Sequence, residues 1–215
     1  FRKSGHILVV NYNVKLPLIL DEFNLRAQSR DAVEDVVLLF AEPEIVSNFH
    51  AHLETERWSN LEIYIRQGDL MSFNTFERQG VFKALAMVVL LPDHMESNFT
   101  ADNFNLKLLT TLVNNKEFFA HLDERQNLRQ PMKCSIELSN NADCRDIALS
   151  ITSKDSGPMF SVITPNDVIG HVLARAMVDV VYYNVFFETL SFQGTNASFI
   201  DPGLFPSFDI SKEIP

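Results

Sequence analysis

The chain has 215 residues, of which 46% are hydrophobic, and its formal net charge is −10. This length and hydrophobic content are sufficient for one large domain with a substantial core. The acidic balance and the lack of any basic run argue against a nucleic-acid partner, because such a surface needs clustered Lys and Arg side chains to displace counterions. The two cysteines, Cys134 and Cys144, show no metal or redox spacing and are expected to be reduced thiols.

Strand patterns and amphipathic helix patterns alternate along the chain, which is typical of a parallel sheet covered on both faces. The predicted strands are, in chain order, 7–12, 35–40, 62–67, 84–91, 132–138 and 159–164. The predicted helices are 16–28, one that follows Pro43, a short one that ends at Gly80, 101–122 and 144–153, with 123–130 as a polar connection. We therefore predict an α/β, Rossmann-like, doubly wound and mainly parallel six-stranded sheet.

A long C-terminal crossover and dimerisation helix is predicted after the last strand. Thr164, Pro165 and Asp167 form its start signal. Residues 168–190 are apolar nearly all round, so one sheet face cannot cover them, while recurring charges make a membrane span costly. Burial against a second chain is the prediction. The expected interface residues are Ile169, Val172, Leu173, Ala176, Met177, Val180, Tyr183 and Phe187.

The predicted domain organisation has three parts. Residues 1–164 form the Rossmann-like lobe, 165–193 form the crossover and interface helix, and 194–215 form an irregular tail that leads into a truncated further lobe. The chain starts at Phe1 rather than methionine, so we expect a piece of a longer polypeptide.

The loop after the first strand lacks the usual phosphate-binding glycines. Asn11, Asn13 and Leu16 stand where a dinucleotide-binding fold carries Gly-x-Gly-x-x-Gly. Asparagine tolerates left-handed backbone, so the turn can persist, but two amides and a leucine would crowd a dinucleotide. The seven glycines of the chain form no other phosphate loop. No dinucleotide cofactor and no catalytic motif are expected, and the fold is interpreted as regulatory.

Several polar side chains are predicted at the carboxyl ends of the strands. Glu42 occupies the position that binds ribose hydroxyls, with a solvated turn carboxylate as the alternative. Asp69 could face the same crevice, and an Asx turn or helix cap explains it equally well. Together with Asn11 and Asn13, these are the ligand-binding candidates. After the fourth strand, Asp93, His94 and Glu96 could hold a cation; the alternative is a polar loop without metal, because hard cations need several converging oxygens.

Taken together, these segments resemble an RCK (regulator of potassium conductance, TrkA-N-like) domain over residues 3–193. The resemblance rests on 4–10 (SGHILVV), 39–42 (LFAE), 68–70 (GDL), 84–90 (ALAMVVL) and, above all, 167–175 (DVIGHVLAR). The polar insert before Pro131 and the stretch 136–139 (IELS) are similar to the CASTOR/POLLUX branch of such channels.

The resemblance implies the cytosolic gating domain of a membrane cation channel, in particular a potassium channel. Its partners would be other copies of the chain, in a dimer or larger ring, and the membrane pore domain of the same polypeptide. Calcium-responsive relatives carry acidic residues after the fourth and fifth strands. Here Glu137 is acidic and Leu91 and Ser139 are not. Asp93, Glu96 and Glu137 are therefore the cation-binding candidates, with calcium as a candidate effector.

Two other functions compete with this one. The first is a soluble NAD(P)-dependent oxidoreductase with a degenerate Rossmann site, and the second is a purely structural oligomerisation domain.

Overall fold

The computed structural model describes residues 3–51, 57–127, 132–152 and 160–178. The strands are β1 Ile7–Val10, β2 Glu34–Phe40, β3 Leu61–Gln67, β4 Ala86–Val89, β5 Lys133–Glu137 and β6 Ser161–Ile163. The helices are α1 Leu16–Ser29, α2 Pro43–Ala51, α3 Phe73–Arg78, the short 3-10 helix η1 Val81–Lys83, α4 Asn98–Val113, α5 Lys116–Asn127, α6 Ala142–Thr152 and α7 Pro165–Val178.

The strands form one six-stranded parallel sheet in the order β3-β2-β1-β4-β5-β6. At its centre, Val9 of β1 pairs with Leu38 of β2 and with Val88 of β4. The α/β doubly wound prediction is confirmed. Because the chain returns from the outer strand β3 to β4 beside β1, the carboxyl ends of β1 and β4 form the switch point, where open α/β sheets place their ligands.

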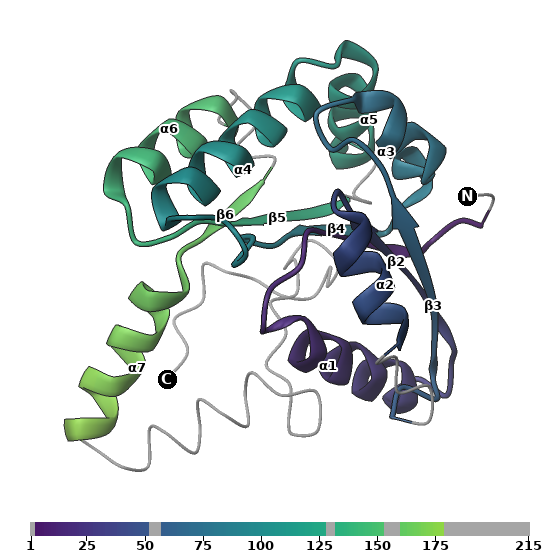
Figure 1. Ribbon diagram of the computed structural model, residues 1–215, viewed down its shortest axis with the longest axis horizontal. Helices are drawn as coiled ribbons and strands as arrows, with labels where there is room; N and C mark the ends of the chain where they lie inside the picture. The colour runs from purple at the N-terminus through teal and green to yellow at the C-terminus, as the bar shows by residue number, and fades with distance from the viewer. Residues whose placement is uncertain (1–2, 52–56, 128–131, 153–159, 179–215) are drawn as a thin grey trace, which may run out of the picture.

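Two hydrophobic cores lie on opposite faces of the sheet. Along β1, Leu8 and Val10 point into one core and Ile7 and Val9 into the other, as the two-residue period of a strand requires. The first core is completed by apolar residues of α3, α4, α5 and α6, and the second by residues of α1 and α2. Figure 1 shows these two helical layers above and below the sheet.

Several element boundaries differ from the prediction, and the differences at Asn11 and Asn115 have a local reason. Strand β1 ends at Val10 because Asn11 takes a left-handed conformation with φ 68°. The single helix predicted over 101–122 is two helices, α4 and α5, because the Asn115 side chain accepts a hydrogen bond from Phe118 N (2.8 Å) and starts a new helix. Residues 123–127, predicted as part of a polar connection, belong to α5.

Helix α7 begins as its start signal predicted, although the threonine acts differently. Thr164 Oγ1 donates to the carboxylate of Asp167 (2.8 Å), which also accepts from Arg145 (3.2 Å), while Asp167 N donates to the Thr164 carbonyl (3.1 Å). The helix extends from the end of β6 away from the sheet (Figure 1). Val180, Tyr183 and Phe187 lie outside the described residues. Within the described part of the chain, no helix has the length and apolar character to cross a bilayer.

Candidate functional site

The turn after β1 is held by a buried amide. Asn11 replaces the first glycine of a dinucleotide loop and adopts the positive φ that such a turn needs. Its Nδ2 atom donates to the carbonyl of Leu90 (3.1 Å), just after β4, and to Oδ1 of Asn105 (3.0 Å). The side chain therefore connects the two central strands across the switch point.

The second asparagine binds a carboxylate at the end of β5. Asn13 Nδ2 donates to Glu137 Oε2 (3.0 Å) and to the carbonyl of Leu91 (3.0 Å), while its Oδ1 accepts from Lys15 N (3.1 Å). Glu137 is only 7% exposed. Its carboxylate also accepts from Leu91 N (3.2 Å) and pairs with the ammonium of Lys15. A buried carboxylate needs such donors and a countercharge to offset its lost hydration.

Asn105 of α4 completes this arrangement from the other side of the sheet. The residue is fully buried, and its Nδ2 donates to the carbonyls of Leu90 (3.1 Å) and Glu137 (2.9 Å). It thus joins the ends of β4 and β5 while accepting from Asn11. We call Asn11, Asn13, Lys15, Asn105 and Glu137 the switch-point network.

The side-chain N–H groups of Asn11, Asn13 and Asn105 all donate to protein acceptors near the switch point. A dinucleotide fold would place a pyrophosphate against the turn that leads into α1. In this chain the carboxylate of Asp93 accepts from Val14 N in that turn (2.8 Å), and the carboxylate of Glu137 lies beside Lys15. Two carboxylates at this turn would repel a phosphate group. In addition, Asp93 already accepts the hydrogen bond of a backbone N–H that could otherwise donate to the phosphate.

The remaining sequence candidates lie around this point. Glu42 Oε1, after β2, is 3.2 Å from His94 Nε2, after β4. Asp69 Oδ1 accepts from Met71 N (2.9 Å), which is the geometry of an Asx turn. Glu96 is exposed. In the part of the chain that the structure describes, no three His, Cys, Asp or Glu side chains converge in a way that could hold a metal ion. The ligand and cation roles of these residues stay predictions.

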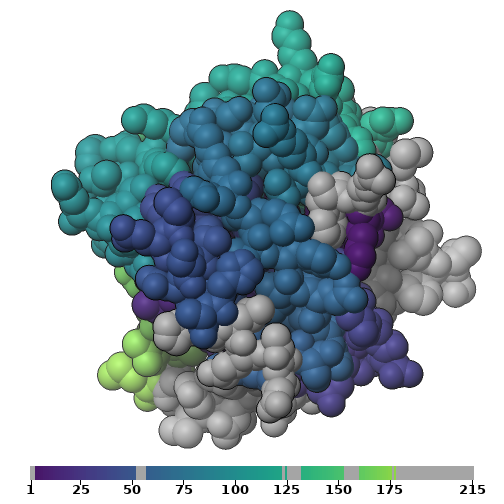
Figure 2. All heavy atoms as spheres, turned by 45° about the vertical axis from the view of Figure 1, so that its right-hand side comes forward, coloured from purple at the N-terminus to yellow at the C-terminus, as the bar shows by residue number. Residues whose placement is uncertain are grey.

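The predicted interface residues on α7 are largely exposed. Ile169 is 53% exposed, Leu173 58% and Met177 89%, and Val172 is half-buried. Because Ile169, Leu173 and Met177 follow one another at intervals of four residues, they share one face of the helix. In the space-filling view, the yellow-green residues of α7 lie at the lower left edge of the molecule (Figure 2).

Comparison with known proteins supports the fold. No family model and no curated protein matches the chain. The human SLO3 gating ring is similar in structure, with a TM-score of 0.51 and 13% identity, over 81% of this chain and 26% of that chain. The chain has a fold that the SLO3 gating ring contains. The TrkA-N domain of the inner membrane protein ybaL from Escherichia coli has a TM-score of 0.47 and 10% identity, over 84% of this chain and 99% of that one.

The SLO3 match confirms the fold that the RCK resemblance predicted, and the narrower likeness to the CASTOR/POLLUX branch stays a prediction. The chain spans about a quarter of the SLO3 chain, 26% of its length.

Sequence reasoning missed Asn105 and Lys15. A signal for Asn105 was present, because it lies at helical spacing among Ala101, Leu108 and Leu112, which are all buried on α4. An amide in such an apolar stripe needs a buried hydrogen-bonding partner. Lys15 carried no comparable signal, since its partner Glu137 lies far along the sequence.

Proposed function

We propose that this chain is a regulatory domain of a cation channel, in particular a potassium channel, and that it assembles into a gating ring through α7. The observation that carries the proposal is the exposed apolar stripe of Ile169, Leu173 and Met177. Contiguous exposed apolar patches are a feature of protein–protein interaction sites. The fold shared with the SLO3 gating ring supports the proposal.

The size of the stripe indicates how strongly α7 could pair. The exposed parts of the three side chains amount to about two whole side chains, worth roughly 3–6 kcal/mol when buried. Two copies would contribute about 6–12 kcal/mol, which is comparable with the roughly 4–15 kcal/mol that association costs. We therefore expect assembly that depends on protein concentration.

A regulatory role also agrees with the switch-point network. An oxidoreductase would need the pyrophosphate of its cofactor near the β1–α1 turn, where this chain places Asn13, Asp93 and Glu137. Regulation requires only that some effector binds two assembly states with different affinity, and a difference of about 1.4 kcal/mol changes their ratio tenfold. The effector in this proposal is not a dinucleotide.

The test is the solution mass of the chain, measured by light scattering, together with calorimetric titration of NADH, ATP and calcium chloride. We expect a mass of at least twice the 24.5 kDa chain at high concentration, and no heat of NADH binding. A monomer at every concentration would contradict assembly. Saturable NADH binding would instead favour the oxidoreductase. A calcium signal that Glu137→Gln removes would assign the cation site.

A further inference from the structure

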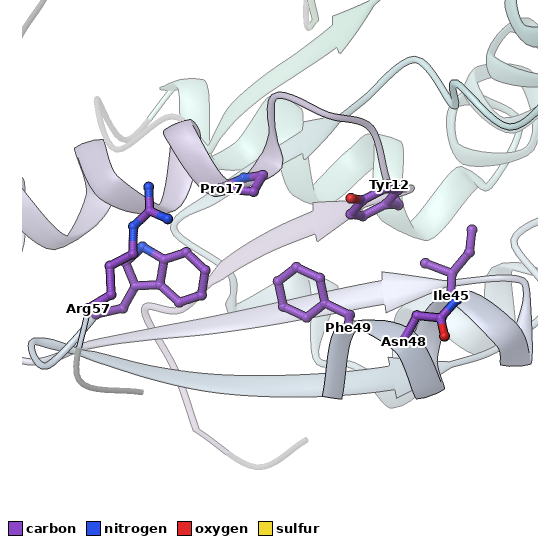
Figure 3. A pocket seen from close by; sticks show the side chains of 7 residues that line it. Tyr12, Pro17, Ile45, Asn48, Phe49 and Arg57 are labelled. Atoms are coloured by element: carbon purple, nitrogen blue, oxygen red, sulfur yellow. The ribbon is translucent and has the colours of Figure 1, made fainter. Parts of the chain in front are cut away.

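A pocket of about 330 Å³ lies in the groove between α1 and α2, outside the switch-point network. Figure 3 shows Tyr12 and Pro17 on the α1 side, facing Ile45, Asn48 and Phe49 of α2, with Arg57 at one end. Trp58 also lines the pocket and is only 4% exposed. The volume is at the lower end of the range for small-molecule sites, which suits a body of one or two fused rings.

Three aromatic side chains give the pocket flat walls. The ring centroids of Tyr12 and Phe49 are 6.2 Å apart at an interplanar angle of 70°, and those of Phe49 and Trp58 are 6.4 Å apart at 6°. Trp58 is fixed in place, because its Nε1 donates to Asp21 Oδ1 of α1 (2.9 Å). Aromatic rings favour offset-stacked and edge-to-face neighbours at these separations, so a further planar ring would find both kinds of contact here.

The charge at the rim decides between two classes of ligand. Three aromatic rings could surround an organic cation or hold a planar ring. The guanidinium of Arg57, however, already lies 5.4 Å from the Trp58 centroid and is bound to Asp21 by two hydrogen bonds of 2.8 and 2.5 Å. It already occupies the cation position over Trp58, so a second cation would find that face of the ring taken. A neutral or anionic ring does not compete for that position.

We infer that the α1–α2 pocket binds a planar aromatic small molecule, neutral or anionic, with the size of a bicyclic ring. Tyr12 lies between Asn11 and Asn13 in the sequence, so a ligand in contact with it would touch the turn that carries the switch-point network. The inference goes beyond the proposed function and stands without it, because binding to the pocket and assembly through α7 are measured separately.

The chain offers a built-in probe for the test, since Trp58 is its only tryptophan. The full chain, labelled with ¹⁵N, gives a single indole N–H resonance. It is titrated with adenosine and indole-3-acetate as planar probes, cyclohexylacetate as a saturated anion and choline as a cation. We expect a saturable shift with at least one planar probe, at a Kd below about 1 mM. Cyclohexylacetate and choline should bind at least tenfold more weakly.

Two variants locate the binding. Phe49→Ala removes one wall and should weaken binding at least tenfold. Asn48→Phe, at an exposed position, places an additional ring at the pocket and should abolish ligand binding. Phe99→Ala is the matched control, because Phe99 is 61% exposed on α4, and it should leave the titration unchanged. The inference is overturned if neither planar probe gives a saturable shift up to about 10 mM. It is also overturned if cyclohexylacetate or choline binds as tightly as the planar probes, or if Asn48→Phe keeps the wild-type titration.

Discussion

Replacing Asn105 by alanine should destabilise the domain more than any exposed substitution on α4. The side chain is fully buried and donates to the carbonyls of Leu90 and Glu137 while accepting from Asn11. Leu90 keeps a second donor in Asn11. The Glu137 carbonyl loses the Asn105 amide, and one N–H of the Asn11 amide loses its acceptor. At roughly 1–3 kcal/mol for each unsatisfied buried group, the variant should lose about 2–6 kcal/mol of unfolding free energy.

Urea unfolding followed by Trp58 fluorescence measures this loss. The slope increases with chain length and should lie near about 3 kcal/mol per molar urea here, so the midpoint should fall by roughly 0.7–2 M. Asn103→Ala is the control, because it makes the same change in the interior of the same helix at a half-buried position. If the Asn105→Ala midpoint stays within about 0.3 M of the Asn103→Ala midpoint, the network does not hold the strand ends together and the reasoning is wrong.

Three further predictions concern titratable groups. Burial lowers the pKa of His6 below its ordinary 6.5, so the unfolded chain takes up a proton at a higher pH than the folded chain does. The free energy of unfolding should therefore fall as the pH drops below about 6.5. In His6→Leu, the urea midpoint should depend less on pH over this range. Burial and the nearby Asp102 raise the pKa of the Cys144 thiol, so native protein at pH 8 should resist a thiol reagent that reacts in urea. Arg57 holds the pKa of Asp21 below its usual range; Arg57→Met should raise it in a carboxyl NMR titration, and an unchanged value would refute the pairing.

The fold could be predicted because its signals are local. Strands such as β2 are buried on both faces and read as continuous apolar runs, and the chain order of strands and helices restricts the topology of a parallel sheet. The errors at Asn11 and Asn115 are also local. In both, an asparagine changes the backbone path, at Asn11 through a positive φ and at Asn115 through a cap, and the residue type permits these roles without requiring them.

The site could be predicted only in part, because its partners are distant in the sequence. The positions of Asn11 and Asn13 in the turn followed from the missing glycines. Their acceptors, Asn105 and Glu137, lie 94 and 124 residues away, and no local pattern encodes those pairs. The α1–α2 pocket was missed for the same reason. Trp58 is held in position by its hydrogen bond to Asp21, 37 residues earlier, and Tyr12 was predicted as part of a strand.

The most direct test of assembly compares the solution mass of wild-type chain with that of Leu173→Glu over a range of concentrations. Leu173 is 58% exposed, so the charge should not disturb the fold of a single chain. Ile147→Glu serves as the control, since Ile147 is 49% exposed on α6 and lies outside the α7 stripe. We expect the wild type and Ile147→Glu to associate alike and Leu173→Glu to remain monomeric at least tenfold higher in concentration. Equal association of all three proteins would contradict an interface built on α7.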